Sequence, residues 1–227
     1  METVLRVGRI LLSLLGLIAV LILLPAMGLG IAGEWQIAFL TFSYFCFFLG
    51  TLWRVVRHGK LVERRNDRQI QHLSGQIASV FALFGLLSVH WIALYEFSQN
   101  RSVGGVGEQW LGAAAIALIL AAILLSQIAI RTIGKFFDRL SIKPDHRLVT
   151  HGIYRSIRHP IYTSYILLFV GWCTMLQSPV SFGLLFIVCV VWFGNRITIE
   201  EEMLIERFGE EYQSYCKNTK RLFPYLY

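Results

Sequence analysis

The sequence has few cysteines, and they form no recognisable pairs or clusters. Cys46, Cys173, Cys189 and Cys216 are widely scattered along the 227 residues. The sequence contains no C-x-x-C motif and no cysteine–histidine cluster with the spacing of a zinc site. Three of the four cysteines lie in apolar stretches, where cysteine usually behaves as a small hydrophobic residue. We therefore predict neither a disulfide framework nor a bound metal.

Long parts of the chain also lack the polar residues of a soluble domain. Hydrophobic residues make up 56% of the sequence. A membrane-spanning helix needs about 20 mostly apolar residues, and four stretches are long enough: residues 10–32, 35–53, 76–97 and 110–130. The first stretch has no small-residue cleavage site behind a short apolar core. We therefore expect it to be a retained helix and not a signal peptide.

A fifth apolar stretch, residues 161–195, is too long for a single crossing. The sequence QSPVS interrupts it at residues 177–181, and its Ser-Pro pair is typical of a turn. Each arm would have about 15 to 17 residues, which is roughly 22–25 Å of helix. Since this is slightly short for the hydrocarbon core, we expect a helical hairpin that thins the membrane or nearly crosses it.

Basic residues are almost absent from one side of the predicted membrane protein. The 21 Lys and Arg residues give a net charge of +7, which could suit nucleic acid. With a cytosolic N-terminus, however, 20 of the 21 lie on the cytosolic side, and only Arg101 lies outside. This is the positive-inside pattern, and it can also attract anionic lipid headgroups. The charge therefore indicates topology, with membrane lipids and not nucleic acid as partners.

Together these segments predict an all-α, multi-pass integral membrane bundle with four N-terminal transmembrane helices, a C-terminal helical hairpin and a cytosolic tail helix. We expect residues 1–130 to form the lipid-facing, substrate part and residues 131–227, with the hairpin 161–195, the catalytic, cofactor-binding part. Both ends of a hairpin lie on one side of the membrane. Residues 146–162 and 196–212 should therefore meet at the cytosolic face. Both termini would be cytosolic, in a bacterial or archaeal inner membrane or in the endoplasmic reticulum.

One histidine, His90, falls inside a predicted membrane helix, residues 76–97. Ionisable residues within a membrane often mark a functional site. This histidine is alone in the outer half of its helix. We interpret it as a packing residue with satisfied hydrogen bonds and not as part of a site.

The motif GIYRSIRHPIY crowds cations and aromatic residues at the start of an apolar run. A basic membrane anchor followed by a proline in the first helical turn would explain Arg158, His159 and Pro160 on their own. Tyr154 and Tyr162 flank this group. Aromatic faces suit a cation such as a sulfonium, and the charged groups could bind a carboxylate. The motif is therefore a candidate cofactor site.

A second polar motif, RITIEEE, follows the hairpin. Arg196 and Glu200 are four residues apart, so they share one face of a helix. An ion pair at the helix exit would explain them and would contribute little stability. However, the hairpin places this pair opposite the first motif, and a charge cluster at the membrane boundary is a candidate functional site.

In combination, these motifs resemble the C-terminal half of the isoprenylcysteine carboxyl methyltransferase family. HRLV, GIY, RHPIY, QSPVS, RITIEEE, FGEEYQSY and LFPYLY occur in the family's order over roughly the last 80 residues. The resemblance implies methyl transfer from S-adenosyl-L-methionine at the cytosolic face of the membrane. The acceptor would be the C-terminal carboxylate of an isoprenylated cysteine, or a similar lipidic group, on a small molecule or a prenylated protein.

The resemblance also implies roles for individual residues. Arg196 would bind the substrate, and Arg196 and Glu200 would be the catalytic residues. The residues that would bind the cofactor are His146, Arg147, Leu148, Val149, Tyr154, His159, Pro160, Ile161, Tyr162, Glu200 and Glu201. If the acceptor were an amine or a thiol, a general base would help, and His159 or Glu201 would be the candidate.

Other functions remain open at this point. Membrane sterol and polyprenol reductases also carry an Arg-His-Pro-like motif and a PYLY-type ending, and they would use NADPH to reduce a lipid double bond. Related methyltransferases act on phospholipid amines or on thiols. A non-catalytic, lipid-binding scaffold is a further alternative. The run of three glutamates after Arg196 and the short hairpin favour the prenylcysteine methyltransferase.

Overall fold

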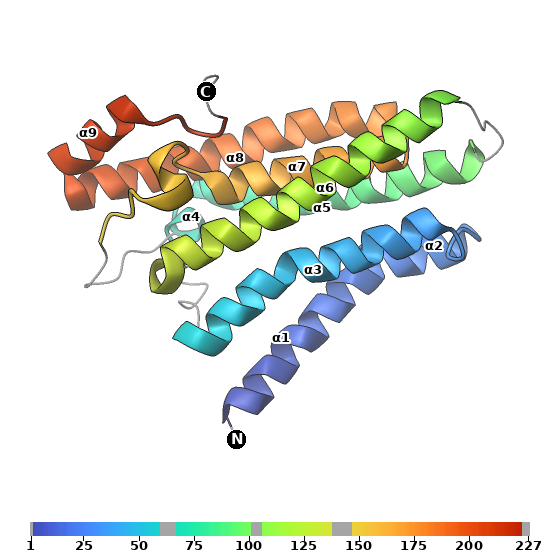
Figure 1. The fold of residues 1–227 in the computed structure, drawn as a ribbon, viewed down its shortest axis with the longest axis horizontal. Helices are drawn as coiled ribbons and strands as arrows, with labels where there is room; N and C mark the ends of the chain where they lie inside the picture. Colours follow the sequence, from blue (N-terminus) through green and yellow to red (C-terminus); the bar gives the residue numbers. More distant parts are fainter. Residues whose placement is uncertain (1, 60–66, 101–105, 138–146, 224–227) are drawn as a thin grey trace.

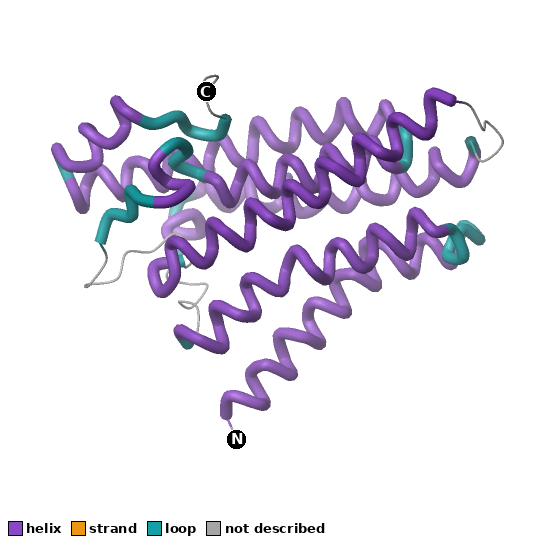
Figure 2. The backbone as a smooth tube through the Cα atoms, in the orientation of Figure 1, coloured by secondary structure: helices purple, strands orange, loops and turns teal. Residues whose placement is uncertain are grey.

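The computed structural model describes residues 2–59, 67–100, 106–137 and 147–223. Within these ranges the chain folds into helices joined by short loops, and no β-strand occurs among them (Figures 1 and 2). His146, which we expect to bind the cofactor, lies outside the described residues. The described part is therefore all-α, as predicted.

Four long helical segments form the N-terminal part, and the first of them is continuous despite a π-helical turn, η1. They overlap the predicted stretches, although the first begins eight residues before residue 10 and ends four residues before residue 32. A short helix, α4, lies between the second and third segments. The bounds are α1 (Glu2–Ile18), η1 (Ala19–Leu23), α2 (Leu24–Gly28), α3 (Trp35–His58), α4 (Arg68–Gln71), α5 (Leu73–Gln99) and α6 (Val106–Ile133).

The C-terminal part is a helical hairpin with short elements at its open end. Two 3₁₀ turns precede the hairpin, and a short helix follows it. The bounds are η3 (Gly134–Phe136), η4 (Gly152–Arg155), α7 (Pro160–Met175), α8 (Pro179–Phe208) and α9 (Glu210–Asn218). Figure 1 shows α9 and the segment that carries η4 at the same end of the molecule, where α7 begins and α8 ends.

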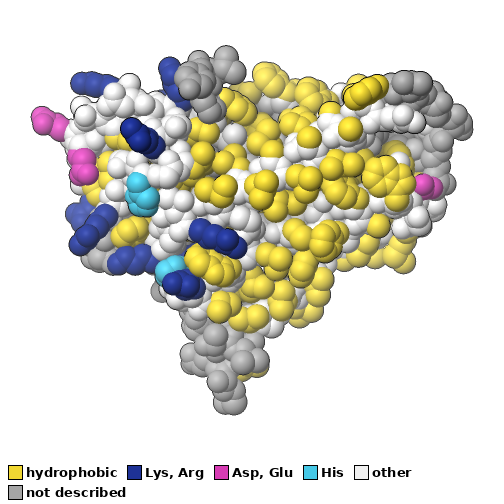
Figure 3. Space-filling view, in the orientation of Figure 1, with side chains coloured by type: hydrophobic (Ala, Val, Ile, Leu, Met, Phe, Trp, Pro, Cys, Tyr) yellow, Lys and Arg dark blue, Asp and Glu magenta, His cyan; other side chains and the backbone are white. Residues whose placement is uncertain are grey.

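Among the described residues, five helices are long and apolar enough to cross a membrane: Val7–Gly28, Trp35–His58, Leu73–Gln99, Gln109–Phe136 and Pro179–Phe208. Figure 3 shows one face of the molecule, on which hydrophobic side chains cover the helices and the Lys and Arg side chains gather toward the end that carries η4 and α9. This separation of apolar and basic surface confirms the predicted integral membrane bundle.

The prediction of two equally short hairpin arms is wrong for the second arm. α7 has 16 residues, as expected, but α8 has 30. At 1.5 Å per residue, α8 is about 45 Å long, against about 30 Å for the hydrocarbon core. α8 begins cleanly because the hydroxyl of Ser178 accepts a hydrogen bond from the Ser181 amide. No proline follows until after the helix ends at Gly209, whose φ is 54°, so the helix extends through the RITIEEE motif into the polar region.

Two glycines let the long helices pack closely. A Cβ on Gly171 of α7 would lie 2.6 Å from the Ile119 side chain of α6, and one on Gly85 of α5 would lie 2.5 Å from the Val188 side chain of α8. Both distances are shorter than side-chain atoms tolerate. The hairpin is therefore held against α5 and α6 by direct backbone approach, which fixes where its open end lies.

A polar group is packed inside the bundle, around the intramembrane histidine. The Nδ1 atom of His90 lies 2.6 Å from the carbonyl oxygen of Leu86, which can only accept, so Nδ1 carries the proton. Its Nε2 atom then accepts from the hydroxyl of Tyr44 at 2.6 Å. The ring also packs against Trp172, with centroids 4.7 Å apart. His90 is thus a packing residue with both nitrogens satisfied, as predicted.

Candidate active site

The two polar motifs meet at the open end of the hairpin. The Nδ1 atom of His159, just before α7, lies 3.6 Å from Oε2 of Glu200 on α8, and its Nε2 atom lies 3.3 Å from Oε1 of Glu201. The Nε atom of Arg158 donates to the same Oε1 at 3.0 Å. Segments that are about 40 residues apart in the sequence therefore form one cluster, as the hairpin requires.

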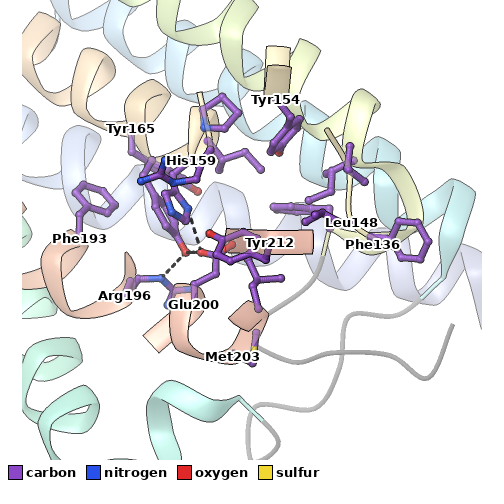
Figure 4. A pocket seen from close by; sticks show the side chains of 18 of the residues that line it. Phe136, Leu148, Tyr154, His159, Tyr165, Phe193, Arg196, Glu200, Met203 and Tyr212 are labelled. Atoms are coloured by element: carbon purple, nitrogen blue, oxygen red, sulfur yellow. Dashed lines mark hydrogen bonds and ion pairs between the residues drawn. The ribbon is translucent and has the colours of Figure 1, made fainter. Parts of the chain in front are cut away.

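A cavity of about 380 Å³ opens beside this cluster (Figure 4). Its volume lies within the usual range for a small-molecule site, about 300–1,000 Å³. Of the residues that we expect to bind cofactor or substrate, those that line it are Leu148, Val149, Tyr154, His159, Pro160, Ile161, Tyr162, Arg196 and Glu200.

One wall of the cavity is a hydrogen-bonded row of three side chains. The hydroxyl of Tyr162 donates to Oε2 of Glu200 at 2.6 Å. The Nε atom of Arg196 donates to the same hydroxyl oxygen at 3.4 Å, and its guanidinium lies 5.7 Å from the centre of the Tyr162 ring. Arg196 and Glu200 share a helix face, and Tyr162 from α7 joins them. The result is a cation and a carboxylate held in fixed positions at the boundary between the apolar helices and the polar end.

The ring of His159 completes this wall. It stacks on Tyr162 with centroids 5.5 Å apart and planes 14° apart, and only 4% of the residue is exposed. Burial alone would lower the pKa of His159, but the hydrogen bonds and charges of Glu200 and Glu201 outweigh it, so the pKa is raised above its usual value. The environment therefore favours an imidazolium between two carboxylates.

Among the described residues, two of those expected to bind the cofactor do not line the cavity. Arg147 is exposed beside it. Glu201 faces the other side of His159, where its carboxylate accepts hydrogen bonds from Arg158 and Arg221. The two adjacent glutamates point to different sides because α8 turns by about 100° per residue. Glu200 faces the cavity, and Glu201 faces the segments that support it.

Sequence patterns missed most of the aromatic and apolar lining. The additional lining residues are Phe48, Thr51, Ile133, Phe136, Phe137, Arg158, Tyr165, Trp192, Phe193, Met203, Leu204, Tyr212 and Tyr215. The FGEEYQSY motif contained two of these tyrosines. α3 and α6 contribute through positions that look like ordinary membrane-facing residues in the sequence, so only the packing of the helices identifies them.

Two phenols that line the cavity lack ordinary hydrogen-bond partners. The hydroxyl of Tyr154 is buried and unpartnered. The hydroxyl of Tyr212 also makes no hydrogen bond of ordinary geometry, apart from a weak interaction with the Cys216 thiol. Burial raises the pKa of both phenols, so both stay protonated. A buried hydroxyl without a partner is costly, so both are suited to bonding a polar ligand in the cavity.

The arrangement can bind a ligand with both polar and apolar parts. Tyr154 and Tyr212 offer aromatic faces that attract a cation, whereas the ring of Tyr162 is already packed against His159 and Phe193. Glu200 supplies a carboxylate, and Arg196 supplies a planar guanidinium suited to a second, anionic group. The structure thus places groups for two ligands of opposite local charge at one cavity.

Comparison with known proteins gives the family. The family model for isoprenylcysteine carboxyl methyltransferases matches residues 115–206. A probable protein-S-isoprenylcysteine O-methyltransferase of Oryza sativa subsp. indica is 30% identical over 145 residues, which are 62% of this chain and 76% of that protein. Protein-S-isoprenylcysteine O-methyltransferase A of Arabidopsis thaliana is 32% identical over 120 residues, or 52% of this chain and 61% of that protein.

An animal relative and a solved structure are also similar. The protein-S-isoprenylcysteine O-methyltransferase of Rattus norvegicus is 36% identical over 121 residues, which are 52% of this chain and 42% of that protein. The structure of a eukaryotic intramembrane Ras methyltransferase aligns with 98% of this chain and 86% of its own length, at 22% identity and a TM-score of 0.41. The family model matches this chain, and the chain covers 76% of the rice protein at 30% identity. The chain therefore belongs to the isoprenylcysteine carboxyl methyltransferase family.

Proposed function

We propose that this protein transfers a methyl group from S-adenosyl-L-methionine to the C-terminal carboxylate of an isoprenylated cysteine at the cytosolic face of a membrane. The observation that carries the proposal is the row Arg196–Tyr162–Glu200, which lies on the wall of a cavity at the boundary between apolar and polar surface. The names of the curated relatives supply the substrate class.

The residues at the cavity fit such a methyl donor. When bound, S-adenosyl-L-methionine supplies an electrophilic methyl group on a positively charged sulfur. The aromatic ring of Tyr154 suits that charge, and the unpartnered hydroxyls of Tyr154 and Tyr212 can bond its polar groups. Glu200 can pair with its ammonium group.

A carboxylate acceptor needs orientation and no general base. Carboxyl groups have ordinary pKa values of about 4, so the acceptor is already ionised near neutral pH. Arg196 can hold it through a planar fork of N–H donors. Phe193, Trp192 and Phe48 line the same cavity and exclude water, which strengthens the electrostatic interactions. Orientation in a dry site is the main help that an in-line displacement requires.

The place of the cavity along the bundle suits two ligands of different solubility. The cavity takes Phe48 and Trp192 from apolar membrane helices and Tyr212 from α9 in the polar region. A prenyl chain can thus stay in the membrane while the donor arrives from water. The concentration of Lys and Arg at this end supports a cytosolic orientation, with both termini in the cytosol.

Ligand-induced stabilisation tests the donor. A compound that binds the folded protein raises its melting temperature. S-adenosylhomocysteine, the product of the donor, should therefore stabilise the purified protein, and NADPH should not. Stabilisation by NADPH alone would favour a membrane reductase. Stabilisation by neither compound would contradict a methyltransferase and favour a lipid-binding scaffold.

A further inference from the structure

A segment that follows α9 pairs with the segment that carries His159. Residues 219–222, which we call the C-terminal strap, run beside residues 156–159 and form a parallel bridge between Ile157 and Lys220. The amide of Arg158 donates to the carbonyl of Lys220 at 2.8 Å, and the amide of His159 donates to the carbonyl of Arg221 at 3.0 Å. The strap is thus tied to the backbone of the cavity wall.

Side chains reinforce this attachment at both ends of the strap. The Nη1 atom of Arg158 donates to the carbonyl of Cys216 at 3.1 Å and also to Thr219. The hydroxyl of Thr163, in the first turn of α7, donates to the carbonyl of Leu222 at 2.6 Å. The strap therefore has a fixed register against the start of α7.

This register places Arg221 against Glu201. The Nη2 and Nε atoms of Arg221 donate to Oε2 of Glu201 at 2.8 and 3.1 Å, and Nε also donates to Oε1 at the longer distance of 3.3 Å. The other oxygen, Oε1, accepts from Arg158 at 3.0 Å and lies 3.3 Å from Nε2 of His159. Only 8% of Glu201 is exposed. One carboxylate thus connects the strap to the cavity histidine.

We infer that Arg221 is a positioning residue, which fixes the carboxylate of Glu201 and, through it, the ring of His159 on the wall of the cavity. With Oε2 held by Arg221, the other oxygen stays directed at Nε2 of His159. The opposite ring nitrogen then faces Glu200. The inference depends on the proposed function in one respect: the binding experiment below uses S-adenosylhomocysteine as the ligand.

The ion pair itself is poorly placed to act through stability. The side chain of Arg221 is 40% exposed, and exposed ion pairs contribute little to folding. Its effect should instead appear in the geometry of the buried groups that it orients. Lys220 provides a matched control, because it is the neighbouring cation on the strap, its side chain is exposed, and no described residue pairs with its ammonium group.

A double-mutant cycle tests the connection. The dissociation constant of S-adenosylhomocysteine is measured by calorimetry on the purified full-length protein and on Arg221→Gln, Glu201→Gln and the double variant. We expect Arg221→Gln to weaken binding about fivefold, Arg221→Lys to weaken it less, and Lys220→Gln to leave it unchanged. In the Glu201→Gln background, Arg221→Gln should have no further effect.

Three outcomes would overturn the inference. These are unchanged binding in Arg221→Gln, an equal loss in Lys220→Gln, or an effect of Arg221→Gln that persists without the Glu201 carboxylate. If Arg221→Gln does not fold, Arg221→Lys takes its place in the cycle. If the unaltered protein does not bind S-adenosylhomocysteine, the proposed function fails, and the inference is decided by a second measurement that needs no ligand.

The second measurement is the pKa of His159, followed by NMR of [¹³C]histidine-labelled protein and assigned with His159→Gln. The charged groups around the ring are Glu200 and Glu201 on α8, Arg158 beside it and Arg221 on the strap, with the phenols of Tyr162 and Tyr212 on α7 and α9. If Arg221 holds Glu201 against the ring, its removal lets the carboxylate move away from Nε2, so the pKa of His159 should fall. A rise, which the loss of a nearby cation alone would cause, or an unchanged pKa would contradict the inference.

Discussion

Two buried histidines in this protein, each beside a tyrosine, have opposite surroundings. His90 is 1% exposed and His159 is 4% exposed. His90 lies in the membrane cluster, with Tyr44 and Trp172, where its hydrogen bonds are to neutral groups. His159 lies in the boundary cluster, with Tyr162, Glu200, Glu201 and Arg196, beside a cavity.

The difference shows that burial of a histidine does not identify a functional site. In the membrane cluster a backbone carbonyl and a phenol satisfy both ring nitrogens, and aromatic rings fill the remaining space. In the boundary cluster carboxylates and guanidinium groups are held together, which is costly unless they are paired. Charged groups that line a cavity can bind a ligand. The boundary cluster has such groups, and the membrane cluster does not.

The largest expected effect is a loss of methyl transfer when Arg196, the cation of the boundary cluster, is removed. Arg196→Ala should lower kcat/KM for a prenylated cysteine by at least about a hundredfold, because a carboxylate in a dry site loses its charged partner. Tyr44→Phe, in the membrane cluster, should leave kcat/KM nearly unchanged. Rates with a labelled methyl donor measure both. Full turnover in Arg196→Ala would refute the assignment of Arg196 to the substrate.

Replacing each histidine in turn separates a role in ligand binding from a role in helix packing. His159→Gln should weaken S-adenosylhomocysteine about 10- to 100-fold, because charge-assisted hydrogen bonds are lost. His90→Phe should leave that affinity unchanged and lower the free energy of unfolding by about 1 kcal/mol, because the hydroxyl of Tyr44 loses its acceptor. Calorimetry and thermal melts measure the two effects. Equal losses of affinity in both variants would contradict the distinction between the clusters.

The next effect is on stability alone, and it comes from the packing that supports the membrane cluster. Gly171→Ala places a Cβ 2.6 Å from the side chain of Ile119 and 3.3 Å from the carbonyl oxygen of Ala115. Overpacking of this kind costs about 1–3 kcal/mol. The control is Gly183→Ala on α8, where a Cβ would meet nothing within 4 Å. A melting temperature of Gly171→Ala equal to that of the control would show that α6 and α7 can separate without cost.

The smallest expected effect is a pH dependence confined to the boundary cluster. The pKa of His159 is raised above its usual value by Glu200 and Glu201, so it binds its proton more tightly in the folded state. Its contribution to stability is therefore fully present below about pH 6.5 and is lost as the pH rises through the raised value. As the pH rises above about 6.5, the melting temperature should fall more in the unaltered protein than in His159→Gln. Parallel curves would exclude this contribution.

Much of the fold and part of the cavity wall could be predicted from the sequence. The apolar stretches are long, and the Ser-Pro turn limits how the hairpin closes, so the meeting of His159 with Glu200 followed from topology. The length of α8 could not be predicted, because apolar content shows where a helix leaves the membrane and not where it ends. The motif resemblance grouped Glu200 and Glu201 together, although their directions differ.

Other contributions depend on contacts that have no local sequence signal. Phe48 and Thr51 of α3 line the cavity because α3 packs on α6, and their positions resemble ordinary membrane-helix residues. Arg221 meets Glu201 only because the strap pairs with the residues before α7. Such long-range pairings are set by packing, so they became visible only in the folded structure.

Transfer of a labelled methyl group to a prenylated cysteine analogue tests the central claim most directly. The purified protein is supplied with labelled S-adenosyl-L-methionine and with one of three acceptors: the prenylcysteine, a phospholipid amine or a small thiol. We predict label in the prenylcysteine only, as a methyl ester from which base hydrolysis releases the label as methanol. We predict no transfer by Arg196→Ala. Label in the amine or the thiol, or in none of the three, would contradict the proposed carboxyl methylation.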